Sequence, residues 1–191
     1  MENRSTETRY LLLIRLPREA EVAIEDRFLG LAGVTKPAMG YHITLAVPFF
    51  VDEAERAGPL QDGLEQLARA LRPFRVEVAG LDAFSGEGHT AYLGVAPSRA
   101  LDELWSTLRR YLESQIDCQY DHYQAGDAFR PHVTLGIGLS DDELRGITVS
   151  HSDAPLVLSF MISEVWLALQ NPNGPWEFLS AIPLGRQADE R

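Results

Sequence analysis

Two histidines, His42 and His132, each open a short strand-forming stretch with the same order of residue types. The stretches read "YHITLAVPFF" (residues 41–50) and "RPHVTLGIGL" (residues 130–139). Because side chains alternate along a strand, His42 shares a face with Thr44, and His132 shares a face with Thr134. A single His-x-Thr is more often a structural feature of a half-exposed strand, but two copies with matching flanks favour a functional pair.

A pair of histidines is suited to cleaving a phosphodiester without a metal ion. One neutral imidazole accepts a proton from the attacking oxygen, and the other, protonated, donates one to the leaving oxygen. With an ordinary pKa of about 6.5, histidine is available in both forms near neutral pH. The hydroxyls of Thr44 and Thr134 would hold the non-bridging phosphate oxygens, and the small residues that follow, Ala46 and Gly136, would leave room for a ligand.

Composition limits the possible partners. The chain has 191 residues, enough for one large domain or two small lobes, and a formal net charge of −11. This charge opposes tight, sequence-blind binding to polymeric nucleic acid, although a nucleotide or a short RNA end remains a possible ligand. The only cysteine, Cys118, excludes an intramolecular disulfide, and the apolar run "YLLLIRLP" is interrupted by Arg15 and ended by Pro17. We therefore expect a cytoplasmic monomer with no membrane segment.

The coarse pattern alternates helices and strands. Helices are predicted from apolar periodicity and capping residues over residues 18–31, 60–71, 98–112 and a short stretch after Ser140, where Ser140 and Glu143 form a capping-box pattern. Strands are predicted at 9–16, 41–50, 74–78, 89–96, 132–139, 155–170 and 176–184. One histidine strand falls in each half with no low-complexity linker between them, which predicts a duplicated α+β unit.

At this point the sequence resembles a known family. "HITL" and "HVTL", one in each half, are similar to the paired motifs of the 2H phosphoesterase superfamily, which includes the bacterial RNA 2',3'-cyclic phosphodiesterases formerly named 2'-5' RNA ligases. The segments "FRVEV", "AYLGVAPSRALDELWSTLRRYL", "FRPHVTLGIG" and "PWEFLSAIPLG" also look like corresponding segments of that family.

The resemblance implies one bilobal α+β domain over residues 1–191, in which two antiparallel sheets flank a central groove with helices outside. It also implies metal-independent and cofactor-independent cleavage of 2',3'-cyclic phosphates or 2'-5' phosphodiesters in nucleotides or short RNA ends. The implied catalytic residues are His42 and His132, with Thr44 and Thr134 on the phosphate. We assign His132 as the base and His42 as the acid, roles that could be exchanged between substrates.

The second motif departs from the family pattern at one position. Many bacterial members look like "HVTLAR", whereas this sequence reads "HVTLGI" and places Ile137 where an arginine could serve RNA phosphate. Arg130 is a candidate substitute for that charge. Tyr41 and Phe129 flank the motifs and are candidates to stack on a base, although such aromatics more often fill cores.

Two alternatives stay open: a small-metabolite cyclic phosphodiesterase that does not act on RNA, and a nucleotide-binding module without turnover. Two proton-transfer groups argue against the second, because binding alone does not need them. The other histidines, His89, His122 and His151, fall in predicted turns or loops. A cluster of His122 with Asp121 and Asp127 matches no zinc spacing, so no metal site is expected.

Overall fold

The computed structural model describes residues 8–51, 57–113, 117–118 and 129–185. The described helices are α1 (Arg18–Phe28), α2 (Ala57–Arg69), α3 (Arg99–Leu112) and α5 (Asp141–Asp153). The strands are β1 (Arg9–Arg15), β2 (His42–Phe50), β3 (Phe74–Gly86), β4 (Gly88–Val95), β5 (Asp117–Cys118), β6 (His132–Leu139), β7 (Val157–Ile162), β8 (Glu164–Gln170) and β9 (Trp176–Pro183). The predicted α+β class is confirmed.

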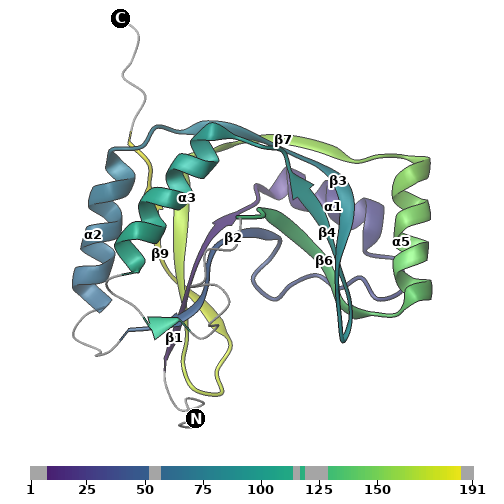
Figure 1. The fold of residues 1–191 in the computed structure, drawn as a ribbon, viewed down its shortest axis with the longest axis horizontal. Coiled ribbons are helices and arrows are strands. Elements are labelled where there is room, and N and C mark those ends of the chain that lie inside the picture. The colour runs from purple at the N-terminus through teal and green to yellow at the C-terminus, as the bar shows by residue number, and fades with distance from the viewer. Residues whose placement is uncertain (1–7, 52–56, 114–116, 119–128, 186–191) are drawn as a thin grey trace, which may run out of the picture.

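The strands form one continuous curled sheet, shown in Figure 1. Its order is β7-β3-β4-β6-β2-β1-β8-β9, with β5 added beside β2, and every described pairing is antiparallel. The expectation of two separate sheets is therefore wrong. The two histidine strands, β2 and β6, pair with each other at Ile43 and Val133, so the halves of the chain are joined into a single sheet.

Alternate residues of the strands face two different environments. Leu12 and Ile14 belong to the main hydrophobic core, whereas Leu11 and Leu13 between them pack in a second, smaller cluster with Met39. The same alternation places Ile43, Leu45, Val133 and Leu135 in the main core. We call the side of the sheet that carries Leu11, Leu13, His42 and His132 the site face.

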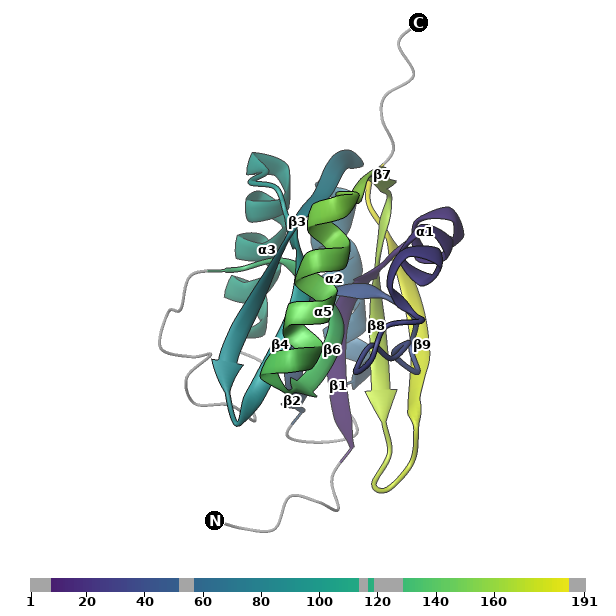
Figure 2. The ribbon, with the colours of Figure 1, turned by 90° about the vertical axis from the view of Figure 1, so that its right-hand side faces the viewer.

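The helices pack their buried apolar side chains against the strand residues of the main core. Their buried apolar side chains include Ile24 and Phe28 of α1, Leu64 of α2, Leu104 of α3 and Ile147 of α5. In Figure 2, which looks at the right-hand side of Figure 1, α5 lies in front of β4 and β6. The helices therefore cover the side of the sheet opposite the site face. None of the described helices is both long and apolar enough to cross a lipid bilayer.

Local capping explains where two helices begin. The Ser98 hydroxyl accepts a hydrogen bond from the Leu101 amide at 3.3 Å at the start of α3. At α5, the Glu143 carboxylate accepts from the Ser140 amide at 2.8 Å, and the Ser140 hydroxyl accepts from the Glu143 amide at 3.4 Å. The predicted capping box is thus confirmed, and both helices satisfy amides that would otherwise lack partners.

Candidate functional site

The two His-x-Thr motifs lie side by side in the middle of the sheet. In the antiparallel pairing of β2 with β6, Ile43 lies opposite Val133, and both side chains are fully buried in the main core. Because the strands run in opposite directions, His42 lies across from Thr134, and Thr44 lies across from His132. The alternation along each strand therefore puts all four polar side chains on the site face, with the two histidines diagonal to each other across the Ile43–Val133 pair.

Both imidazoles are held by the same local hydrogen bond. Nδ1 of His42 lies 2.9 Å from the carbonyl oxygen of Gly40, and Nδ1 of His132 lies 2.7 Å from that of Arg130. A carbonyl oxygen can only accept, so Nδ1 carries the hydrogen in both rings. In the neutral form this leaves each Nε2 with a free lone pair, the atom that a proton-transfer reaction requires.

The electrostatics of His42 favour its neutral form. Burial lowers the pKa of His42 below its ordinary value of 6.5; the hydrogen bond to Gly40 partly opposes this, and the charge of His132 lowers the pKa further. The two histidines are therefore close enough to influence each other's protonation. A proton on His132 makes a second proton on His42 less favourable.

On one side of the pair, His132 is enclosed by aromatic rings. The ring of Phe84 meets it edge-on at 5.1 Å between centroids, and the ring of Tyr92 lies at 5.0 Å. Tyr92 in turn donates a hydrogen bond to Asp82 at 3.1 Å. These contacts restrict the orientation of the His132 ring.

Arg130 lies on the same side. Its carbonyl holds His132, and its charge lowers the pKa of Tyr92, against the larger raising effects of burial and Asp82. The side chain is exposed, so it is available to an anion near Tyr92.

On the other side, Arg15 is the cross-strand neighbour of His42. Arg15 and His42 are direct partners in the β1–β2 pairing, so their side chains leave the same face of the sheet. The guanidinium lies over the ring of Trp166 at 4.9 Å and over that of Phe178 at 4.3 Å. The sequence pattern indicates Arg15 only as a break in an apolar run. The signal that could have identified Arg15 is its place as the last residue of β1, directly after five buried hydrophobic residues.

Two candidate residues lie away from the site face. Tyr41 is 1% exposed and packs in the main core, and Phe129 stacks on Trp105 of α3 at 4.7 Å with the rings 7° from parallel. A base has no access to the buried ring of Tyr41, and Phe129 covers the helical side of the molecule. We therefore leave both out of the candidate site.

The small residues after the motifs serve packing. Ala46 is buried in the main core. A Cβ atom on Gly136 would lie 2.6 Å from the Gly33 carbonyl oxygen, so glycine allows the loop before β2 to cross β6 closely. Room for a ligand is therefore not the reason for small residues here. Ile137 follows with 76% of its surface exposed and offers no charge to a phosphate.

The remaining described histidines lie in β4 (His89) and α5 (His151), not in the turns or loops expected for them, and they make other contacts. Nε2 of His89 lies 2.7 Å from Asp141, and His151 stacks on Phe28 at 6.1 Å. His122, Asp121 and Asp127 fall outside the described residues. Within the described ranges, no group of three or more His, Cys, Asp or Glu side chains is placed to hold a metal ion.

Sequence comparisons identify the family of the chain and several of its relatives. The family model of the 2'-5' RNA ligase superfamily matches residues 35–173, which include both motifs. Bacterial relatives carry the name "Putative phosphoesterase": one from Halalkalibacterium halodurans is 26% identical over 146 residues, covering 76% of this chain and 80% of the relative. One from Bacillus licheniformis is 27% identical over 151 residues, covering 75% and 80%.

Solved structures share the fold. TT0787 of Thermus thermophilus has a TM-score of 0.68 at 19% identity, covering 94% of this chain and all of that one. E. coli LigT complexed with 3'-AMP has a TM-score of 0.63 at 22% identity, covering 93% and 98%. The same E. coli protein has also been solved with ATP. Because the family model matches residues 35–173, which is most of the chain, the chain belongs to the 2'-5' RNA ligase superfamily.

Proposed function

We propose that this protein is a phosphoesterase that opens 2',3'-cyclic phosphates, or cuts 2'-5' phosphodiesters, by general acid–base catalysis: one of His42 and His132 takes a proton from the attacking water, and the other gives a proton to the leaving oxygen. The observation that carries the proposal is the shared geometry of the two rings. Each donates Nδ1–H to the carbonyl two residues earlier, and both stand on one face of adjacent strands. This leaves two Nε2 atoms available to one phosphate.

The threonines complete the binding site. Thr44 and Thr134 occupy the other diagonal of the four-residue block, so a phosphate between the imidazoles can accept a hydrogen bond from each hydroxyl. These hydrogen bonds would orient the phosphorus and stabilise the charge that develops on its oxygens.

The environment of His42 suggests a division of labour. Burial favours its neutral form, the form that accepts a proton. We therefore propose His42 as the base that activates water and His132 as the acid that protonates the leaving ribose oxygen. This reverses the assignment expected from the sequence.

We favour a small substrate over an RNA polymer. The chain has a net charge of −11, and the exposed side chain of Ile137 places no cation where many relatives are expected to have one. Long-range attraction to a polyanion is therefore weak, and recognition must come from the few residues around the histidines. A nucleoside cyclic phosphate, a short RNA end or another small cyclic phosphodiester fits this arrangement.

Turnover of a substrate panel in EDTA tests the proposal. The panel contains nucleoside 2',3'-cyclic monophosphates, a short RNA with a cyclic-phosphate end and a 2'-5' dinucleotide. We expect His42→Ala and His132→Ala each to lose about 10²- to 10⁴-fold in kcat/KM. His89→Gln is the matched control, because His89 is engaged by Asp141, and its activity should stay near wild type. Wild-type activity that survives in either alanine variant would overturn the proposal.

A further inference from the structure

Arg15 is a cation on the site face that the proton-transfer chemistry does not use. It is exposed, and it forms cation–π contacts with Trp166 and Phe178. No residue that the structure describes forms a hydrogen bond or an ion pair with its guanidinium. Five N–H donors are therefore held in place by two rings and left available to a ligand.

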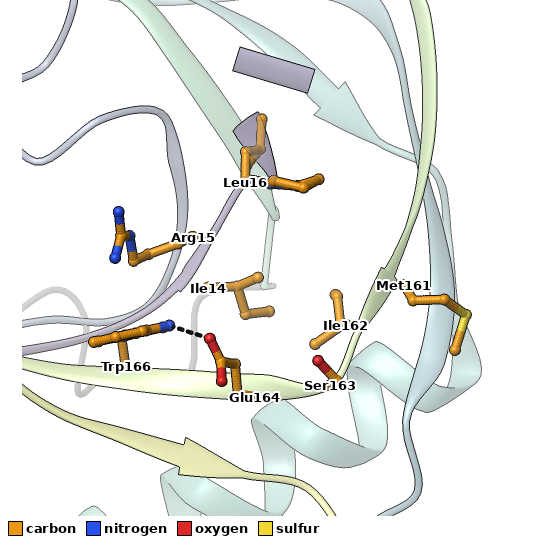
Figure 3. A pocket seen from close by; sticks show the side chains of 9 residues that line it. Ile14, Arg15, Leu16, Met161, Ile162, Ser163, Glu164 and Trp166 are labelled. Atoms are coloured by element: carbon orange, nitrogen blue, oxygen red, sulfur yellow. Dashed lines mark hydrogen bonds between the residues drawn. The ribbon is translucent and has the colours of Figure 1, made fainter. Parts of the chain in front are cut away.

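The nearest acidic side chain on β8 is occupied elsewhere. Oε1 of Glu164 accepts a hydrogen bond from the indole nitrogen of Trp166 at 2.9 Å, as Figure 3 shows. Trp166 thus has two effects on Arg15: its ring supports the guanidinium, and its N–H holds the carboxylate that would otherwise be the natural partner of that cation.

The guanidinium is displaced from the imidazole of His42. Strand β1 lies between β2, which carries His42, and β8, and the guanidinium lies over Trp166 of β8 and Phe178 of β9, on the side of β1 away from His42. Figure 3 shows the Arg15 side chain on the side of Trp166, away from Met161 and Ile162. A group bound by Arg15 is therefore distinct from a phosphate held between the two histidines.

We propose that Arg15, supported by Trp166 and Phe178, binds a second anionic group of the substrate, so that the enzyme prefers a small phosphodiester carrying an additional phosphate. This rests on the proposed function for the position of the first phosphate. A planar guanidinium stacked on aromatic rings is preorganised for phosphate, because little side-chain freedom is lost when the anion binds.

The neighbouring pocket does not hold this anion. It has a volume of about 210 Å³ and lies between the end of β1 and the β7–β8 turn, where Ser163 and Glu164 line it. The Glu164 carboxylate would repel a phosphate there. The second anion would instead meet the N–H groups of Arg15 at the edge of the guanidinium that Trp166 and Phe178 leave uncovered.

Calorimetric binding of two non-hydrolysable probes tests the inference without turnover. Adenosine 3'-monophosphate carries one phosphate, and adenosine 3',5'-bisphosphate carries two. We expect the wild type to bind the bisphosphate more tightly and Arg15→Gln to lose about 10- to 100-fold for the bisphosphate, with a change below about threefold for the monophosphate. Arg145→Gln on α5 is the control, because Arg145 is an exposed arginine paired with Asp142, away from the site face.

Three further variants separate the charge of Arg15 from the support that Trp166 gives to its guanidinium. Trp166→Phe keeps a ring beneath Arg15 but releases Glu164, so bisphosphate binding should weaken. Adding Glu164→Gln to it should restore binding, because the freed side chain no longer carries a charge. Arg15→Lys keeps the charge without the planar fork and should fall between wild type and Arg15→Gln.

The outcomes distinguish this inference from the proposed function. Equal losses of both probes in Arg15→Gln would overturn it and place Arg15 on the first phosphate or the base. Unchanged binding of both probes would overturn it entirely. If the bisphosphate preference depends on Arg15 but no panel substrate is turned over, the second-anion site stands and the proposed function fails.

Discussion

The two halves of the sheet present the same motif in different surroundings. His132 lies among Phe84 and Tyr92, while His42 lies beside Arg15 and the Trp166–Phe178 pair. In both halves Nδ1 donates to the carbonyl two residues earlier. The repeated motif therefore sets the ring geometry, and the neighbouring strands set what distinguishes one histidine from the other.

The largest expected effect is the loss of kcat/KM in the two histidine-to-alanine variants, and it would show which half of the sheet supplies the base. A p-nitrophenyl phosphodiester has a leaving group that departs without protonation, so loss of the acid matters less for it than for a cyclic phosphate. We expect His132→Ala to lose much more activity on the cyclic phosphate than on the nitrophenyl diester, and His42→Ala to lose about 10²- to 10⁴-fold on both. Steady-state kcat/KM for the two substrates measures this. The opposite pattern would return His132 to the role of base.

The threonines test whether the phosphate lies centrally between the halves. Thr44→Val and Thr134→Val each remove one hydroxyl, and each should lower kcat/KM by about 10- to 100-fold. Thr44→Ser and Thr134→Ser keep the hydroxyl and are the controls. A large loss in only one valine variant would show that the phosphate lies nearer to one histidine.

A smaller effect is expected from the rings around His132. Phe84→Leu removes the edge-on contact, and we expect kcat to fall about 2- to 10-fold while KM changes little, because ring orientation and not substrate binding is altered. Tyr92→Phe keeps its ring and loses only the hydrogen bond to Asp82, so its activity should fall less. A loss confined to KM would instead place Phe84 in direct contact with the substrate.

The smallest expected effect is on the pH dependence of the unfolding free energy. The pKa of His42 is lower in the folded protein than its ordinary value of 6.5, so the unfolded chain takes up a proton first as the pH falls. The contribution of His42 to stability is therefore complete above about pH 6.5 and decreases below it. Urea unfolding at pH 7.5 and pH 5 should show a smaller loss of unfolding free energy in His42→Gln than in the wild type.

A second histidine needs its own control in that measurement. The pKa of His151 is also lowered, first by burial and then by the charge of Arg27, so His151→Gln measures its separate share. If His42→Gln and the wild type lose the same unfolding free energy, burial does not hold His42 in its neutral form, and the proposed role as base loses its physical basis.

Local signals predicted much of the secondary structure. Ser140 and Glu143 marked the start of α5, and Ser98 marked the start of α3, because capping depends on residues three positions apart. The extent of β3 was not predicted. It continues through Gly80 and Ser85 to Gly86 because pairing with β4 supplies hydrogen bonds that this composition does not indicate.

The sequence by itself determined the candidate residues for the chemistry: two histidines and two threonines, with the His and Thr of each motif on one face of its strand, because alternation is a local property of extended chains. Only the tertiary structure decided that the His-Thr face of β2 and the His-Thr face of β6 lie on the same side of one sheet, through the Ile43–Val133 pairing. It also placed Tyr41 in the core and Arg15 beside His42. Strand pairing joins residues far apart in the chain, so local periodicity carries no information about which residues become neighbours.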